Sequence, residues 1–240
     1  MKEIKKEKQE IIDKLTDKTL KKKKSRYNRR LILWEITIKI SFTLKRFLDI
    51  VFCGIFLILF SPIFVFTALC IIIENPGPIF YGQIRVGKDG RHFDFYKFRS
   101  MVVGADRMKD DLIQQNESGD GVIFKMKKDP RITKTGRIIR RFSIDELPQL
   151  INVLKSDMSL VGPRPPLPRE VAEYTLEDRK RLHVIPGITC IWQVSGRSEI
   201  PFDEQVLMDK KYILESKSIF KDIALLFRTA GAVFGGKGAY

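Results

Sequence analysis

An uncharged apolar run from Ile50 to Ile73 limits the folds open to this chain more than any other feature. Its 24 residues contain no Asp, Glu, Lys or Arg. As one helix the run would be about 36 Å long, which is enough to cross the hydrocarbon core of a bilayer. Pro62 lies in the middle, where it removes a backbone hydrogen bond and kinks the helix, and Ser61 can satisfy a freed carbonyl. The run therefore predicts a membrane helix with a break at Ser61-Pro62.

Basic side chains flank this run on both sides. Lys45 and Arg46 precede it, and five Lys and Arg residues between Arg85 and Arg99 follow it. Because basic flanks stay on the cytoplasmic side, both ends are expected there, which a helix that enters the membrane and returns would satisfy. A simple spanning helix fits the length as well, so the residues alone leave both topologies open.

The positive charge of the chain is concentrated ahead of the apolar run. The formal net charge is +15, and residues 1–46 contribute +10 of it, with 16 Lys and Arg against 6 Asp and Glu. A basic segment leading into a membrane anchor is typical of attraction to anionic lipid, although such an arm can also bind nucleic acid. Residues 1–24 mix Lys, Glu and Ile without a sustained periodicity, which predicts a mobile segment.

The cysteine and histidine content restricts the possible chemistry. Cys53, Cys70 and Cys190 form no CxxC pair, which argues against a disulfide framework or a zinc cluster. His92 and His183 are the only histidines in the sequence, so a histidine-rich metal site is excluded. Catalysis is therefore expected from carboxylates and arginines.

The pattern after the apolar run indicates an α+β fold with few strands. Strands are expected at 79–86 and 92–98, joined by a hairpin turn at 87–90. Helices are expected at 102–116, 147–156, 170–182, 201–212 and from 219 onward, with extended backbone at 162–166 and a turn at 186–189.

The adjacent carboxylates of Asp145 and Glu146 are the strongest candidates for chemistry. A purely structural interpretation competes, because Ser143 followed three residues later by Glu146 matches the capping box at the start of a helix. Acidic residues in a first turn also suit the helix dipole. Taken alone, the pair is compatible with either role.

Neighbouring residues favour a chemical role for the pair. Pro148 fits the first turn of a helix that begins near Leu147, which would place both acids just ahead of the helix and keep a carboxylate there ionised. Arg140 and Arg141 lie close by, and a capping box does not need them. An ionised Asp145 in this position could hold Mg²⁺ or attack phosphorus as a nucleophile.

Further basic residues are candidates for phosphate binding. Arg164 lies between prolines, where a guanidinium on stiff backbone loses little entropy when it binds an anion. Lys97 and Arg99 alternate with Phe98 on a predicted strand, so both can point to the same side. Each of them could equally be an ordinary surface residue, and Arg197 is a weaker candidate by itself.

Several segments follow one another in a recognisable order between Leu44 and Phe227. They are Lys45-Arg46-Phe47-Leu48-Asp49, Ser61-Pro62, Lys97-Phe98-Arg99-Ser100-Met101, Asp129-Pro130-Arg131-Ile132-Thr133, Asp145-Glu146-Leu147-Pro148-Gln149-Leu150, Asp157-Met158-Ser159-Leu160-Val161-Gly162-Pro163-Arg164-Pro165 and Pro186-Gly187-Ile188-Thr189. Together they resemble the monotopic polyprenyl-phosphate phosphoglycosyl transferases of bacteria, the initiating sugar transferases.

This resemblance implies a fold and a location. The fold would be α+β and mostly helical, with a small β-hairpin and amphipathic interfacial helices. It would divide into a basic leader over 1–44, a re-entrant membrane helix over 45–73 broken at Ser61-Pro62, and a catalytic domain over 74–240. The catalytic domain would lie on the cytoplasmic face of the bacterial cell membrane. Larger members of the family carry a multispanning region where this chain has its leader.

The resemblance also implies an activity. A hexose 1-phosphate, of glucose or galactose, would pass from a UDP-sugar to undecaprenyl phosphate with release of UMP, as the first membrane step of capsule or exopolysaccharide synthesis. Asp145 would be the nucleophile of a ping-pong reaction, Glu146 would assist, and Mg²⁺ would bridge Asp145 and the diphosphate. The substrate-binding residues would be Lys97, Arg99, Arg140 and Arg164 at the phosphates and Arg197 toward the nucleotide.

Expected partners follow from the same account. They are the UDP-sugar, undecaprenyl phosphate and anionic membrane lipid, with no nucleic acid and with a homo-oligomer left open. The basic leader also permits a non-enzymatic membrane-anchored scaffold or a nucleic-acid-binding protein. A hydrolase of nucleotide sugars using the same carboxylates is a third interpretation.

Overall fold

The computed structural model describes residues 2–108, 126, 129–196, 200–215 and 219–235. The chain divides into two compact units, Met1–Lys45 and Arg46–Tyr240. Helix α1 (Lys2–Leu59) makes up all that is described of the first unit and enters the second. The expectation of a mobile segment over 1–24 did not anticipate this helix. Lys, Glu and Leu are strong helix formers, and the chain has no Gly or Pro before Gly54.

The apolar run is broken at the predicted place. Helix α1 ends at Leu59 and α2 (Ser61–Glu74) begins at Ser61, with a bend of 59° between them. The Ser61 hydroxyl donates to the carbonyl oxygen of Ile58 at 2.8 Å, and Pro62 occupies the first turn of α2, where its missing N–H costs no helical hydrogen bond. Among the described residues no single helix meets the length and hydropathy needed to cross a membrane, whereas this bent pair meets them together.

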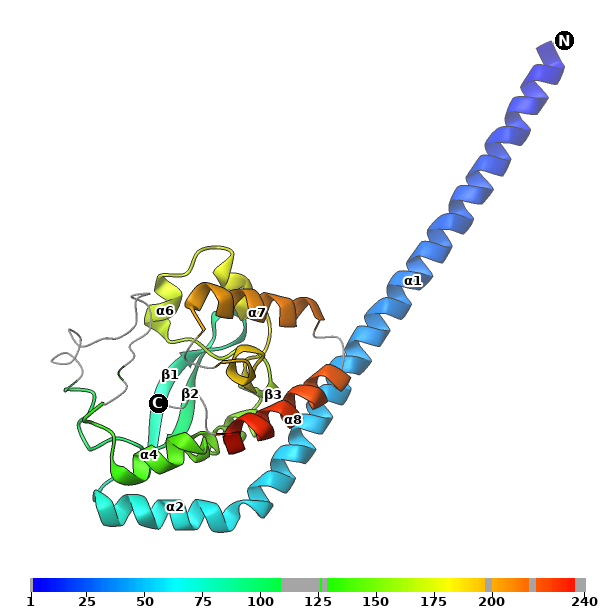
Figure 1. The fold of residues 1–240 in the computed structure, drawn as a ribbon. Coiled ribbons are helices and arrows are strands. Elements are labelled where there is room, and N and C mark those ends of the chain that lie inside the picture. The colour runs from blue at the N-terminus through cyan, green and yellow to red at the C-terminus, as the bar shows by residue number, and fades with distance from the viewer. Residues whose placement is uncertain (1, 109–125, 127–128, 197–199, 216–218, 236–240) are drawn as a thin grey trace. The chain divides into compact units, whose positions relative to one another are not determined.

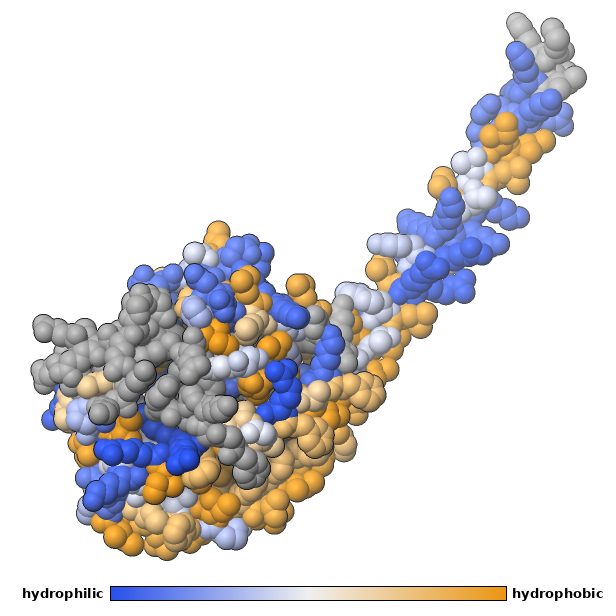
Figure 2. Space-filling model, viewed as in Figure 1, coloured by the Kyte–Doolittle hydropathy of each residue, from blue (hydrophilic) through white to orange (hydrophobic). Residues whose placement is uncertain are grey.

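Hydrophobic side chains cover the outer surface around this bend. Figure 2 shows them gathered along α2 and the adjoining end of α1. Phe66 is 68% exposed and Ile73 is 80% exposed. Others in the same patch are Ile58, Leu59, Val65 and Leu69. An apolar surface of this extent is typical of a membrane or protein interaction site.

The next elements form the predicted hairpin. Strands β1 (Phe80–Val86) and β2 (His92–Phe98) pair antiparallel, with the 3₁₀ turn η1 (Lys88–Gly90) between them (Figure 1). Tyr81 lies opposite Lys97, and Arg85 lies opposite Phe93. Residues directly opposite share a face of the ribbon, so this register decides which side chains line a common surface.

The next elements in the described part of the chain are three short helical segments. They are α4 (Lys134–Arg141), the 3₁₀ turn η3 (Ile144–Glu146) and α5 (Gln149–Leu154). Helix α4 lies beside α2 (Figure 1). The Glu74 carboxylate, at the end of α2, accepts hydrogen bonds from the backbone N–H groups of Lys134 and Thr135 at 2.6 and 2.7 Å. Glu74 thus satisfies two unpaired N–H groups at the start of α4.

A small parallel sheet replaces one predicted turn. Strand β3 (Ser159–Val161) pairs with β4 (Gly187–Thr189), so the turn predicted at 186–189 was wrong. The two backbones approach so closely here that a Cβ atom on Gly187 would lie 2.0 Å from the backbone nitrogen of Gly162. Glycine therefore marks a close backbone approach at this position and not a chain reversal.

Two of the predicted helices also differ. Residues 102–108 form turns, and the rest of the helix expected over 102–116 lies outside the described residues. The helix expected over 170–182 is two pieces, α6 (Pro168–Ala172) and the 3₁₀ helix η4 (Asp178–His183). Thr175 and Asp178 exchange side-chain and backbone hydrogen bonds that start the second piece.

The last two helices agree with those expected at 201–212 and from 219 onward. A 3₁₀ turn η5 (Trp192–Val194) precedes α7 (Phe202–Glu215) and α8 (Ile219–Gly235). Trp192 is buried and packs with Cys190 and Ile200. The main core lies between the hairpin, α5, β3 and the end of α1, around the fully buried side chains of Phe95 and Val153.

Arg46 and Asp49, just ahead of the apolar run, form hydrogen bonds that hold α1 against this core. The Arg46 guanidinium donates to the carbonyl oxygen of Leu154 at 3.2 Å and to the hydroxyl of Ser156 at 2.8 Å. The buried Asp49 carboxylate accepts a hydrogen bond from the Ser159 hydroxyl at 2.7 Å. These contacts join α1 to the end of α5 and to β3.

Candidate active site

A large cavity of about 1770 Å³ lies on one face of the hairpin. Tyr81, Gln83 and Arg85 line it, as expected for alternate positions of one strand, and Lys97 joins them from β2. Among the described residues that line it, eight are Lys or Arg and five are Asp or Glu. The cavity therefore favours an anionic ligand.

The acidic pair reaches the cavity through a tight turn after α4. Ser143 has φ = 54°, a left-handed conformation that is uncommon for residues other than glycine. Its side chain makes no capping hydrogen bond, so the capping-box interpretation of Ser143 and Glu146 was wrong. Asp145 and Glu146 instead lie in the 3₁₀ turn η3, which packs against β2.

Two basic side chains hold Glu146. Its Oε1 atom lies 2.9 Å from Nζ of Lys97 and 3.1 Å from Nη1 of Arg164. Burial alone would raise the pKa of Glu146, but the charges of Lys97 and Arg164 outweigh burial and hold that pKa well below its usual range. Glu146 is therefore ionised at neutral pH.

Asp145 has a different environment. Its side chain is buried, and its Oδ2 atom lies 3.6 Å from Nζ of Lys97. Burial raises the pKa of Asp145, the charge of Lys97 opposes this, and the charge of Glu146 adds to it. The sequence predicted that the N-terminus of a helix beginning near Leu147 would keep the Asp145 carboxylate ionised. In the structure α5 begins at Gln149, four residues after Asp145. Two neighbouring carboxylates with diverging pKa values are typical of groups with separate catalytic roles.

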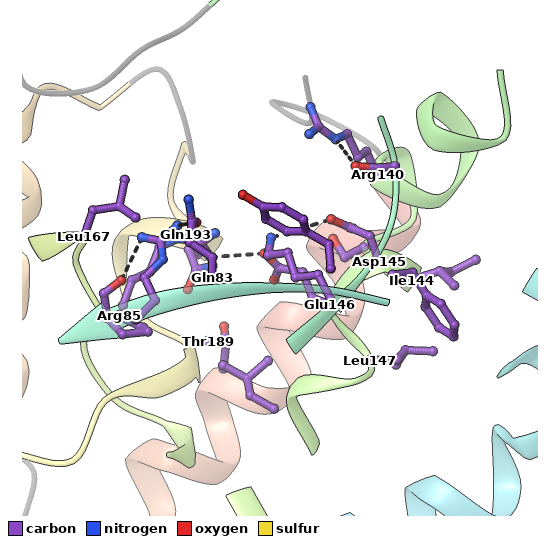
Figure 3. Close-up of a pocket in the computed structure, with 18 of the residues that line it drawn as sticks. Gln83, Arg85, Arg140, Ile144, Asp145, Glu146, Leu147, Leu167, Thr189 and Gln193 are labelled. Atoms are coloured by element: carbon purple, nitrogen blue, oxygen red, sulfur yellow. Dashed lines mark hydrogen bonds and ion pairs between the residues drawn. The ribbon is translucent and has the colours of Figure 1, made fainter. Parts of the chain in front are cut away.

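Arg140 approaches the same cavity from the last turn of α4. Its Nε atom donates to the hydroxyl of Ser100 at 2.9 Å. Burial lowers the pKa of Arg140, and the negative charge of Asp145 opposes that shift. In the view of Figure 3 the acidic pair lies between Arg140 on one side and Arg85 on the other.

The remaining predicted residues are placed differently. Arg99 lines the cavity, but its guanidinium donates to the carbonyl oxygen of Asn75 in the turn after α2. Lys97 and Arg99 therefore have separate partners, although both line the cavity. Arg197 lies outside the described residues. The structure thus brings Lys97, Arg140 and Arg164 around the acidic pair.

The sequence analysis did not identify two residues that shape this site. Asn152 is fully buried in α5, and its side chain accepts from the Tyr96 N–H at 3.1 Å and donates to the Asp94 carbonyl at 2.6 Å. These bonds fix α5 to the edge of β2 that does not pair with β1, beside Lys97. Arg85 is the second, and its position on the cavity-facing side of β1 could have been read from strand alternation.

A magnesium ion fits this site only with the help of a substrate. Among the described residues no group of three His, Cys, Asp or Glu side chains could hold a metal. Asp145 with its neighbour Glu146 offers one or two carboxylates, which is the usual protein share where Mg²⁺ also binds substrate phosphates and water. The residues present are therefore compatible with Mg²⁺ bound together with a diphosphate.

Several known proteins are similar to this chain in sequence. The chain is 48% identical over 203 residues to the galactosyl transferase CpsE of Streptococcus agalactiae, which covers 81% of this chain and 43% of the relative. It is 43% identical over 200 residues to the undecaprenyl-phosphate galactose phosphotransferase of Salmonella typhimurium, covering 82% of this chain and 42% of the relative. The exopolysaccharide production protein ExoY of Rhizobium meliloti is 34% identical over 199 residues, covering 82% and 88%.

The chain thus spans less than half the length of the first two relatives and most of the length of ExoY. The sequence pattern of one family, described as bacterial sugar transferase, matches residues 40–236. That match includes the bend at Ser61-Pro62, the hairpin and the acidic pair. Because it covers most of the chain, this protein belongs to the bacterial sugar transferase family.

Proposed function

We propose that this protein transfers a hexose 1-phosphate from a UDP-sugar, galactose or glucose, to undecaprenyl phosphate, giving undecaprenyl-diphosphate-sugar and UMP. The observation that carries the proposal is a buried Asp145 beside Glu146, whose charge is held by Lys97 and Arg164. The names of the Streptococcus and Salmonella relatives support galactose, and that of ExoY supports exopolysaccharide synthesis as the pathway.

In the first step a carboxylate oxygen of Asp145 attacks the phosphorus that carries the sugar. The new O–P bond forms as the bond from that phosphorus to the bridging oxygen breaks, and the electron pair leaves with UMP. An aspartyl phosphosugar results. A carboxylate whose pKa is raised by burial is more basic, and hence more nucleophilic once ionised, than an exposed one.

Lys97 and Arg164 would have two successive partners in this step. Without substrate they bind Glu146. A bound diphosphate would share both cations with Glu146, which keeps the negative charges of nucleophile and substrate from repelling one another. Arg140 would add a third positive charge on the far side of Asp145. Mg²⁺, held by Asp145 and phosphate oxygens, would neutralise further charge on the phosphates.

In the second step an oxygen of undecaprenyl phosphate attacks the phosphosugar. The Asp145–phosphorus bond breaks, and its electron pair returns to the carboxylate. Phe56, Phe60 and Ile63, at the bend between α1 and α2, line the same cavity and offer apolar surface to a polyprenyl chain. Two sequential steps let one site serve a water-soluble donor and then a lipid acceptor.

The location follows from the apolar patch. Its exposed side chains on α2 and the end of α1 would lie in the bacterial cell membrane, with the bend at Ser61-Pro62 returning the chain to the cytoplasmic face (Figure 2). Basic residues on both sides of the apolar run support this topology. Residues 1–44 would then lie near anionic lipid, where basic side chains are attracted.

UMP release tests the proposal. Detergent-solubilised protein with Mg²⁺ and UDP-galactose should release about one UMP per enzyme without acceptor, and turn over repeatedly once undecaprenyl phosphate is added. The Asp145→Asn variant should release none, and Asp157→Asn, outside the cavity lining, serves as the matched control. UDP-glucose is the second donor to be tried.

Three results would contradict the proposal. Continuous UMP release without lipid would indicate hydrolysis of the nucleotide sugar. Equal UMP release by Asp145→Asn and wild type would show that Asp145 is not the nucleophile. A wild-type protein that releases no UMP from any of a panel of UDP-sugars would favour a non-enzymatic scaffold.

A further inference from the structure

Arg85 lines the cavity with its guanidinium over the Phe95 ring, 5.2 Å from the ring centroid, and among the described residues no carboxylate forms an ion pair with it. Its Nη1 atom donates to the carbonyl oxygen of Pro165 at 3.0 Å, and its Nη2 atom donates to the side-chain oxygen of Gln83 at 2.9 Å. Both acceptors are uncharged. Its Nε atom is buried without a hydrogen-bond partner among the described residues. An arginine fork that faces a cavity with neutral partners is suited to bind an anion.

The charges around Arg85 favour the binding of such an anion. Burial and the nearby positive charge of Arg164 lower the pKa of Arg85 to about 10. The carboxylates of Glu170 and Glu146 oppose this shift only in part. Glu146 is already held by Lys97 and Arg164, so a phosphate between the two arginines would relieve their repulsion.

The register of the hairpin shows where this anion would lie. Lys97 pairs with Tyr81 near the end of the hairpin that contacts α2 through Phe64 and Phe98. Arg85 lies four residues beyond Tyr81 on the same strand face, which is about 13 Å farther from α2 along the strand. Its side chain bends back toward Gln83, since it donates to that residue. Arg85 is thus on the side of the acidic pair that is farther from the apolar bend.

We propose that the guanidinium of Arg85 binds the phosphate that leaves with the nucleoside, opposite the lipid-facing side of Asp145. This inference rests on the proposed transferase function and adds a residue to it. The side nearer α2 has the apolar residues suited to the acceptor lipid, whereas Gln83, Thr189 and Gln193 near Arg85 offer polar groups suited to a nucleotide (Figure 3).

The role of Arg85 in the reaction follows from its position. As the bond between the sugar-bearing phosphorus and the bridging oxygen breaks, negative charge develops on the leaving UMP phosphate. The two N–H groups of a guanidinium can donate to two oxygens of that phosphate. Arg85 would therefore stabilise the leaving group, while Lys97 and Arg164 hold the phosphate that Asp145 attacks.

Calorimetric titration of the full chain in lipid nanodiscs tests this role with UMP and with uridine as separate probes. Arg85→Gln should weaken UMP binding about 10- to 100-fold and leave uridine binding unchanged, because only the phosphate contact is lost. Arg91→Gln, an exposed arginine at the turn of the same hairpin, should bind UMP like wild type. Arg85→Lys should lose several-fold affinity for UMP, because an ammonium lacks the fork.

The outcomes separate the two proposals. Wild-type affinity for UMP in Arg85→Gln would overturn the role of Arg85 and leave the transferase proposal intact. Equal losses for UMP and uridine, together with a lower midpoint of thermal unfolding, would show that Arg85 only supports the Pro165 segment. A wild-type protein that binds neither UMP nor UDP would overturn the proposed function itself. If Arg85→Gln fails to fold, wild-type UMP affinity in Arg85→Lys is the result that overturns the inference.

Discussion

The ammonium group of Lys97 lies 2.9 Å from the Glu146 carboxylate, on a strand paired with the one that carries Arg85. The same ammonium is 3.6 Å from the carboxylate of Asp145. One cation therefore touches both members of the acidic pair, and its loss should affect both. Substitution of Lys97 is therefore the most direct test of how positive charge supports the acidic pair.

Lys97→Met should lower kcat/KM for the UDP-sugar about 100- to 1000-fold, because a donor aimed at developing phosphate charge is lost while side-chain length is kept. Lys88→Met is the matched control, since Lys88 is exposed in the hairpin turn. A loss of only a few-fold in Lys97→Met, with normal UMP release, would show that Lys97 is not needed at the phosphates.

The pH dependence of kcat/KM for the UDP-sugar should report Asp145. Only the ionised carboxylate attacks, so the rate should fall as the pH drops through the pKa of Asp145. Burial raises that pKa above its ordinary value of 3.8. Removing the positive charge in Lys97→Met should raise it further and move the acid limb to higher pH. An acid limb that moves to lower pH in this variant would contradict the assignment.

Glu74→Ala should destabilise the start of α4. The variant removes both acceptors for the Lys134 and Thr135 N–H groups, and losing a helix N-cap costs about 1 kcal/mol. The midpoint of thermal unfolding should drop by about 2–4 °C. Glu173→Ala, an exposed glutamate at the end of α6, should show almost no change, and an equal drop in both variants would argue against the capping role.

Asn152→Asp should lower the midpoint of thermal unfolding more at high pH than at low pH. Aspartate keeps the acceptor for the Tyr96 N–H but lacks the donor for the Asp94 carbonyl. Burial should raise the pKa of the new carboxyl, so its ionisation favours the unfolded state as the pH rises. The midpoint of thermal unfolding, measured at pH 5 and pH 8 for this variant and for Asn152→Ala, checks this. A difference from Asn152→Ala that does not grow with pH would contradict the explanation.

Local sequence signals predicted the elements that depend on local physics. The break at Ser61-Pro62 follows from the missing N–H of proline, and the hairpin follows from alternation on either side of Gly87-Lys88-Asp89-Gly90. The placement of Lys97 in one site with the acidic pair came from chemical type and from family resemblance. None of these needed knowledge of which distant segments meet.

The features that were missed depend on distant contacts. Strands β3 and β4 have three residues each, too few to show a period, and they pair across more than twenty intervening residues. Glu146 matches a capping box in sequence, yet its carboxylate binds Lys97 and Arg164 because η3 packs against β2. Asn152 gave no signal because its partners are backbone atoms of a strand more than fifty residues earlier.

Intact-protein mass spectrometry tests the central claim most directly. Wild-type protein with Mg²⁺ and UDP-galactose, without acceptor, should gain the mass of one hexose phosphate, located on the peptide that contains Asp145 and discharged by undecaprenyl phosphate. Asp145→Asn should gain no mass. An adduct on another residue, or sugar transfer to the lipid with no adduct in a rapid-quench time course, would contradict Asp145 as the nucleophile.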